Sequence, residues 1–166
     1  MTIIAVDPGK NGAVVWRNDV GVGVMKMPET RGDTIQLFKN IVHLEGDTPN
    51  QCVCYHERVA NFIPGGGAAH MMTFGRMAER CSCIVETLGI RLIEITPQAW
   101  QKELGLGTSK RSKGATPAAN SIAKREWKSK LKAESQRRFP EIKVTLANAD
   151  ALLILEAAIK LEGTKQ

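Results

Sequence analysis

The sequence predicts an α/β fold in which a five-stranded mixed sheet is flanked by helices. Three observations support this prediction. Short apolar runs rich in β-branched residues alternate with longer segments of helical periodicity. Only turn signals separate the first three runs, which is typical of an antiparallel meander. A helical segment separates each of the later runs, which is typical of parallel strands joined by crossovers.

The first part of the chain predicts three strands and a helix. Pro8, Gly9 and Gly12 end the first run and reverse the chain, and Asn18-Asp19 marks the second hairpin. An apolar stripe with helical spacing follows, and Asp33 near its start suits the helix dipole. We expect strands at 2–7, 13–17 and 20–27, and a helix at 32–44.

The remainder predicts two more strands and four helices. Gly89 is the expected C′ residue of a long helix, and Thr96-Pro97 caps and starts a short one. We expect strands at 51–56 and 90–95, helices at 68–88, 97–104, 118–138 and 148–161, and a basic loop at 105–117. This element order is that of a ribonuclease H-like core. With 166 residues, the chain is expected to form a single domain over 1–166.

Charge is concentrated in one segment. Ten of the 23 Lys and Arg residues lie between Thr108 and Arg138, with only two acids, so the rest of the chain is slightly acidic. This pattern favours a polyanion partner, although a solvated helix face is the usual alternative. No signal peptide or long apolar run is present, so a cytoplasmic, DNA-associated protein is expected. Cys52-x-Cys54 and Cys81-x-Cys83 lack zinc-knuckle spacing, which favours buried thiols.

Three carboxylates stand at the ends of predicted elements. Asp7 ends the first strand, Glu57 ends the fourth, and Asp150 opens the last helix. Because the first and fourth strands should be adjacent and parallel, Asp7 and Glu57 should converge at one end of the sheet. Clustered carboxylates repel one another unless a cation joins them, and Mg²⁺ prefers such oxygen ligands. Paired metal ions can activate a water and stabilise the leaving oxygen of a phosphodiester.

Each acid also has a simpler explanation. Asp7 could be a turn aspartate and Asp150 a helix-start aspartate. Glu57 is harder to explain this way, because an apolar strand rarely ends on a buried acid, although Arg58 could pair with it.

Four segments together resemble the RuvC family of Holliday junction resolvases, particularly its smaller phage-type members. They are Ala5–Ala13 (AVDPGKNGA), His56–Val59 (HERV), Phe74-Gly75-Arg76, and Ala149–Leu152 (ADAL). The resemblance covers residues 2 to about 160. It implies a homodimer that nicks four-way DNA junctions symmetrically with Mg²⁺, or with Mn²⁺ in its place. It also implies a bacterial or phage-infected cell, and it assigns Asp7, Glu57 and Asp150 as metal ligands.

The chain departs from the family pattern at one position. Family members usually carry an acid or a histidine three residues before the last aspartate, where this chain has Ala147. Either three acids suffice, with Asn148 or a water substituting, or the protein binds junctions without cutting them.

The resemblance also implies basic and aromatic groups near the metals. Lys128 and Lys132 are the candidates for a catalytic lysine, and Lys124 lies on the same helix face at four-residue spacing. Phe62 is the candidate for a side chain that stacks at the junction centre. The remaining predicted DNA-binding residues are Arg76, Lys110, Arg111 and Lys113. A solvated helix face for the lysines and a core anchor for Phe62 remain the alternatives.

Three functions from different classes are consistent with the sequence. The first is a structure-selective, Mg²⁺-dependent endonuclease, and the second is a junction-binding protein that does not cut. The third is an actin-like phosphotransferase, because Asp-Pro-Gly-x-x-Gly resembles a phosphate-binding turn. That class needs two such domains, so a length of 166 residues argues against it.

Overall fold

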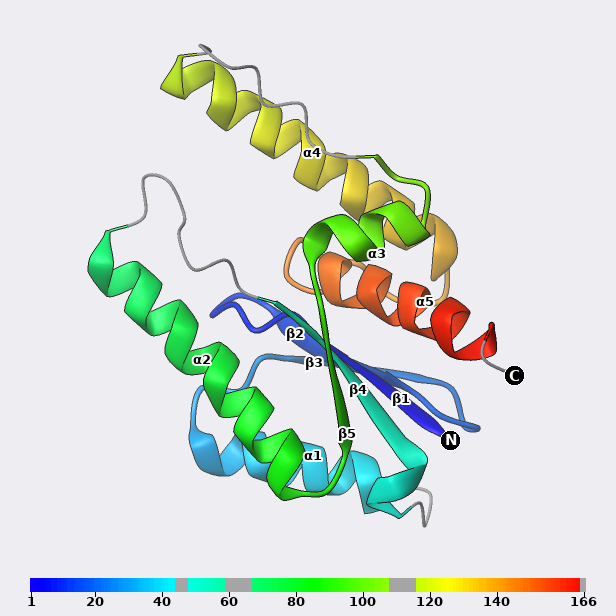
Figure 1. Ribbon diagram of the computed structural model, residues 1–166. Helices are drawn as coiled ribbons and strands as arrows, with labels where there is room; N and C mark the ends of the chain where they lie inside the picture. Colours follow the sequence, from blue (N-terminus) through cyan, green and yellow to red (C-terminus); the bar gives the residue numbers. More distant parts are fainter. Residues whose placement is uncertain (44–47, 59–66, 108–115, 165–166) are drawn as a thin grey trace.

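A five-stranded mixed sheet forms the centre of the molecule (Figure 1). The computed structural model describes residues 1–43, 48–58, 67–107 and 116–164, and the side chains of 68–70 are not described. The strand order is β3-β2-β1-β4-β5, with β1 antiparallel to β2, β2 antiparallel to β3, and β1–β4 and β4–β5 parallel. The strands are β1 (Thr2–Val6), β2 (Ala13–Arg17), β3 (Val22–Lys26), β4 (Cys52–Glu57) and β5 (Arg91–Ile95). The predicted ribonuclease H-like sheet is therefore confirmed.

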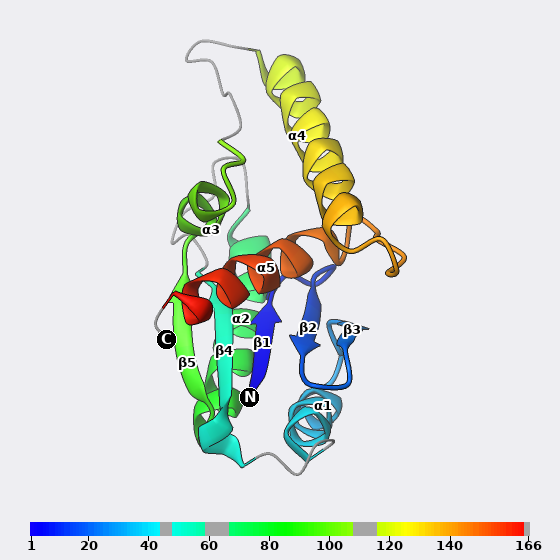
Figure 2. The ribbon, with the colours of Figure 1, turned by 90° about the vertical axis from the view of Figure 1, so that its right-hand side faces the viewer.

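Helices cover both faces of this sheet (Figures 1 and 2). The pair α1 and α2 packs on one face, and α5 packs on the other, with α3 and α4 beside it. Their bounds are α1 (Arg31–His43), α2 (Ala68–Thr87), α3 (Pro97–Glu103), α4 (Pro117–Arg138) and α5 (Ala149–Gly163), and a 3₁₀ turn, η1 (Pro49–Gln51), precedes β4. In the described part of the chain, none of the helices combines the length and apolar character that crossing a bilayer requires.

Strand β1 is buried on both faces, and all its residues after Thr2 are apolar. Ile3 and Ala5 face the core beneath α5, whereas Ile4 and Val6 face the core beneath α1 and α2. Alternation of side chains across a strand accounts for this division. Cys52 and Cys54 share the second face, as predicted, and both are buried free thiols.

The third strand begins later than predicted, at Val22 rather than residue 20. The Asn18 side chain accepts hydrogen bonds from the backbone N–H groups of Val20 and Gly21, at 3.2 and 3.1 Å. Gly21 has a φ of +150°, at the limit of the range that favours glycine. The turn therefore runs from Asn18 to Gly21 and leaves Val20 86% exposed.

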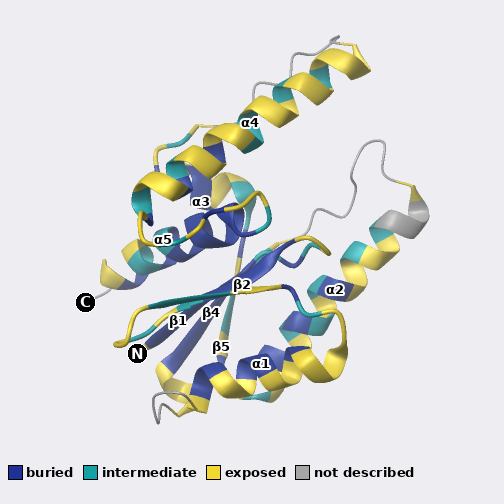
Figure 3. Cartoon of the chain, turned by 180° about the vertical axis from the view of Figure 1, so that it is seen from behind, coloured by how far each residue is buried: buried dark blue, intermediate teal, exposed yellow. Residues whose placement is uncertain are grey.

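Helix α4 is anchored at its C-terminal end only. Leu131 and Ser135 are buried against the body, whereas most residues of the first three turns are exposed (Figure 3). Figure 2 shows this N-terminal half extending beyond the rest of the fold. Pro117 at the first helical position and the Thr116 hydroxyl, which accepts from Ala119 N at 3.2 Å, define its start.

Candidate active site

The three predicted acids come together at the carboxyl end of β1 and β4. Val6 pairs with His56 in the parallel ladder, so Asp7 and Glu57 leave the sheet side by side. Helix α5 packs across β1 and brings Asp150, in its first turn, to the same place. The carboxylates are close enough for the charge of Asp150 to raise the pKa of Asp7, and for the charges of Asp7 and Asp150 to raise the pKa of Glu57.

Asp7 is held by the turn that follows it. Its carboxylate accepts from Gly9 N at 3.2 Å, and its own N–H donates to Ala13 O at 3.0 Å. A Cβ on Gly12 would lie 2.1 Å from the carbonyl oxygen of Asp7, so this position requires glycine. The DPGKNG sequence therefore fixes the direction of the carboxylate. Burial, followed by the neighbouring Asp150 charge, raises the pKa of Asp7.

Glu57 is oriented by a residue that the sequence did not suggest. Trp100 Nε1, from α3, donates to Glu57 Oε1 at 2.9 Å, and the Trp100 side chain is fully enclosed. The partner suggested by the sequence was Arg58, whose backbone N–H instead donates to Ile95 O at 2.8 Å. Burial, followed by the Asp7 charge, raises the pKa of Glu57 to about 7.

Asp150 forms an ion pair with Lys128 of α4, which selects one lysine from the predicted set. Lys128 Nζ donates to Asp150 Oδ2, whereas Asp150 Oδ1 is buried and has no hydrogen-bond partner among the described residues. Burial disfavours the charge on Lys128, but the carboxylates of Asp150, Asp7 and Glu57 outweigh it and raise the pKa of Lys128. The charge of the ammonium group in turn offsets part of the rise in the pKa values of Asp7 and Glu57.

The Asn148 side chain is engaged in the segment before α5. Asn148 Oδ1 accepts from Thr145 N at 2.7 Å, and its Nδ2 donates to Lys143 O at 3.3 Å. The amide therefore closes the turn that leads into α5, and its oxygen is already engaged by a backbone donor. The substitution of Asn148 for the ligand that Ala147 lacks therefore stays a prediction.

Two solved structures share this architecture. The structure of Thermus thermophilus RuvC matches with a TM-score of 0.60 and 13% identity, over 99% of this chain and 97% of that one. The chain has the RuvC fold. T. thermophilus RuvC in complex with a Holliday junction substrate matches with a TM-score of 0.61 and 11% identity, over 99% and 96% of the two chains. No protein-family model and no curated protein sequence matches the chain.

Three further predicted site residues, Lys124, Lys132 and Arg76, lie on two helices of this fold. Lys124 and Lys132 are exposed on α4, one turn to either side of Lys128. Arg76 is exposed on α2. Phe62, Lys110, Arg111 and Lys113 lie outside the described residues.

The acidic side chains fit a divalent cation by their chemistry. Hard cations prefer carboxylate oxygens, and Asp150 Oδ1 is a buried oxygen without a donor. In the part of the chain that the structure describes, no three acidic, histidine or cysteine side chains are already arranged around one point that could hold an ion. The Lys128 ammonium lies among the acids instead and supplies positive charge there. Ion binding would therefore require Asp150 to exchange or share its contact with Lys128.

Proposed function

We propose that this protein is a structure-selective endonuclease that resolves four-way DNA junctions by paired, metal-dependent phosphodiester hydrolysis. The observation that carries the proposal is the convergence of Asp7, Glu57 and Asp150 at one end of a sheet with the RuvC fold. In this proposal Mg²⁺, or Mn²⁺ in its place, is held by these three acids. A bound divalent ion would activate water and stabilise the leaving oxygen.

The protein's own groups would prepare the site for this chemistry. Trp100 keeps the Glu57 carboxylate in one orientation. The DPGKNG turn directs Asp7, and Lys128 balances charge where a phosphate would approach the acids. Lys128 is accordingly the lysine we propose for the catalytic centre, and Lys132 and Lys124 are proposed to contact DNA.

DNA binding would use the basic helix next to this centre. The N-terminal half of α4 extends beyond the body and carries exposed Lys124 and Arg125 (Figure 3). Phosphate contacts from such a surface position a nucleic acid without reading its sequence. Arg76, Lys110, Arg111, Lys113 and Phe62 complete the proposed DNA-binding set.

We further propose a homodimer that acts on DNA in the cytoplasm of a bacterial or phage-infected cell. A four-way junction presents equivalent strands, so two active sites related by a two-fold axis would match it. The exposed face of α2 is the proposed interface. A monomer of 18.2 kDa as the sole species in sedimentation, with and without junction DNA, would contradict this part.

The second candidate is a junction-binding protein that does not cut, and Ala147 is the observation that favours it. A nicking assay on a synthetic four-way junction with Mg²⁺ separates the two candidates. Paired nicks at symmetric positions support the endonuclease. Tight, junction-selective binding without nicks, together with nicks by Ala147→Asp, supports the non-cutting protein. Absence of junction-selective binding contradicts both.

A further inference from the structure

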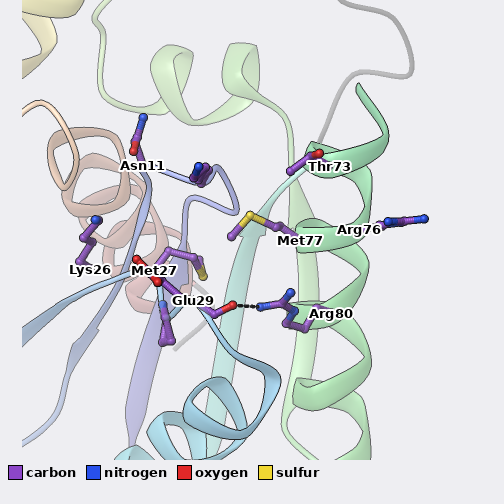
Figure 4. Close-up of a pocket in the computed structure, with 10 residues that line it drawn as sticks. Asn11, Lys26, Met27, Glu29, Thr73, Arg76, Met77 and Arg80 are labelled. Atoms are coloured by element: carbon purple, nitrogen blue, oxygen red, sulfur yellow. Dashed lines mark hydrogen bonds between the residues drawn. The ribbon is translucent and has the colours of Figure 1, made fainter. Parts of the chain in front are cut away.

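The DPGKNG turn that holds Asp7 faces helix α2 (Figure 4). Asn11 of the turn and Thr73 and Met77 of α2 line one pocket between them. Figure 4 shows Met77 pointing from α2 across this pocket, whereas Arg76 points away from it. The face of α2 that carries Met77 is therefore the one turned toward the segment that holds Asp7.

Phe74 lies on the same face of α2 as Met77, because residues three apart in a helix are neighbours. Met77 is buried in the core beneath α1 and α2, and Phe74, one turn nearer the start of the helix, is half-buried. A Cβ placed on Gly9 would lie 3.5 Å from Phe74 Cε2 and 3.4 Å from Asp7 Oδ1. The aromatic ring and the carboxylate therefore approach the same side of Gly9.

Gly9 depends on its surroundings for its orientation. Its N–H donates to Asp7 Oδ1 at 3.2 Å, and the direction of this N–H is set by the Pro8–Gly9 peptide. Proline fixes its own φ but not its ψ, and glycine has no side chain to restrain it. Gly9 O accepts from Gly12 N at 2.8 Å, which restrains the peptide that follows Gly9 and not the one that precedes it. Packing of the aromatic ring against Gly9 adds a restraint from the α2 side.

The helix behind this ring is fastened to the same part of the fold as the turn. Arg80 Nη1 donates to Glu29 O at 3.0 Å, and Cys81 Sγ lies 3.8 Å from Met27 Sδ (Figure 4). Both contacts join α2 to the segment that follows β3. Met27 N in turn donates to Gly12 O at 3.0 Å, which joins that segment to the turn. A ring carried by α2 is therefore held at a constant position relative to the turn.

We propose that Phe74 is a positioning residue for Asp7. Its ring packs on Gly9 and keeps the Gly9 N–H directed at Asp7 Oδ1, so that the carboxylate is presented to a divalent cation in one orientation. This inference rests on the proposed function and gives a role to a residue that does not itself touch the ion. Groups that orient a metal ligand commonly change metal affinity by about 10- to 100-fold when they are replaced. Stacking on a DNA base is the competing role for an aromatic ring beside the acids.

The test compares Phe74→Ala with Met72→Ala, a change of an exposed side chain on the same helix. Phe74→Leu, which keeps most of the apolar bulk, is the conservative variant. Mg²⁺ affinity is measured from melting temperatures at increasing Mg²⁺ without DNA. Exchange of the Gly9 amide proton with water is measured by NMR in EDTA at slightly acidic pH.

Phe74→Ala should weaken Mg²⁺ affinity by about 10-fold, the lower end of the range, because the ring acts through Gly9. The Gly9 amide proton should exchange about 2- to 10-fold faster, as expected when one hydrogen bond is loosened. Phe74→Leu should stay closer to the parent in both measurements, and Met72→Ala should match the parent.

A Phe74→Ala protein that melts at a lower temperature in EDTA, with the Mg²⁺ affinity and Gly9 exchange of the parent, would overturn the proposal and leave the ring a structural role only. Weaker junction binding in EDTA with unchanged Mg²⁺ affinity would assign the ring to DNA and would also overturn it. If the parent does not bind Mg²⁺, the proposed function fails, but Gly9 exchange still tests whether Phe74 holds the turn. Unchanged exchange would then overturn the positioning role as well.

Discussion

Helix α5 carries a buried carboxylate near each end, and the two lie in opposite surroundings. Glu162 and Asp150 are almost equally enclosed, at 7% and 6% exposure. Glu162 accepts from the Tyr55 hydroxyl and from Arg91 Nη2, each at 2.6 Å, so both of its oxygens have donors. Asp150 has Lys128 on one oxygen and no hydrogen-bond partner among the described residues on the other.

This difference separates a structural acid from one that we propose to be functional. A buried polar atom without a partner is costly, so it persists where another requirement maintains it. The Glu162 group attaches α5 to β4 and β5, which holds the helix in place. Asp150 stands beside two further acids and depends on added positive charge. Burial alone would not have distinguished them.

The largest expected effect is on cleavage. Where the parent is active, Asp150→Asn should reduce junction nicking by at least about 100-fold, because a ligand to the metal is lost. Asp7→Asn should do the same, with junction affinity and folding largely unchanged. Glu162→Gln, at the other end of α5, should still nick below its melting temperature. A parent-like rate for Asp7→Asn would show that the site is assigned wrongly.

For stability, the change at Glu162 is expected to have a larger effect than the change at Asp150. Glu162→Gln should lower the free energy of unfolding by about 2 kcal/mol, because Arg91 loses its carboxylate in a buried network. The value lies below that of a fully buried pair, since the Arg91 side chain is 51% exposed. Asp150→Asn should cost less than about 0.5 kcal/mol, because Lys128 can turn to water. Chemical denaturation of both variants measures the contrast.

In the absence of metal, the pH dependence of the free energy of unfolding should show how much burial of the mutually repelling acids destabilises the fold. The pKa of Glu57 is raised from its ordinary value of 4.5 to about 7, so the folded protein binds this proton more tightly than the unfolded chain. The contribution of Glu57 is therefore fully present below pH 4.5 and is lost as the pH rises through 7. The free energy of unfolding of Glu57→Gln minus that of the parent should be about 1–2 kcal/mol larger at pH 8 than at pH 4.5.

His56 also changes the stability of the parent with pH, so the effect of Glu57 must be measured as a difference between Glu57→Gln and the parent. Burial lowers the pKa of His56 to about 4, so its contribution to stability is lost as the pH falls from 6.5 toward 4, opposite to Glu57. The difference between Glu57→Gln and the parent at each pH removes this effect. A difference that does not vary between pH 4.5 and 8 would contradict the raised pKa of Glu57.

A smaller effect is expected at Trp100. Trp100→Phe keeps a smaller aromatic ring but removes the N–H that lowers the pKa of Glu57. That pKa should rise, and in the absence of metal the pH at which the Glu57 contribution to stability is lost should move to a higher value with it. Trp127, a partly buried residue of α4 whose ring lies under the Lys130 ammonium, offers the matched control Trp127→Phe. Equal pH profiles of stability for the two variants would indicate that Trp100 does not act on Glu57.

Much of this site could be predicted because it depends on local sequence and strand order. Asp7 follows a buried strand and precedes a glycine turn, and a parallel β1–β4 pair then places Glu57 beside it. Asp150 follows from the start of α5. Each inference uses periodicity or topology, and both are encoded over short stretches of sequence.

The unpredicted parts depend on tertiary packing. Trp100 reaches Glu57 across 43 residues, and nothing in its local pattern indicates a polar partner. Lys124, Lys128 and Lys132 share a helix face, so only the packing of Leu131 and Ser135 determines which lysine meets Asp150. The later start of β3 follows from a single side chain, Asn18, that extends its turn.

The central claim is that the acids at the N-terminal end of α5 form a divalent-cation site. It is tested most directly by melting the protein at pH 8 with and without Mg²⁺, in the absence of DNA. A ligand at 100 times its dissociation constant stabilises a protein by about 2.7 kcal/mol. Mg²⁺ should therefore raise the melting temperature of the parent and of Glu162→Gln, and leave Asp7→Asn and Asp150→Asn nearly unchanged. Equal shifts in all four proteins would contradict the claim.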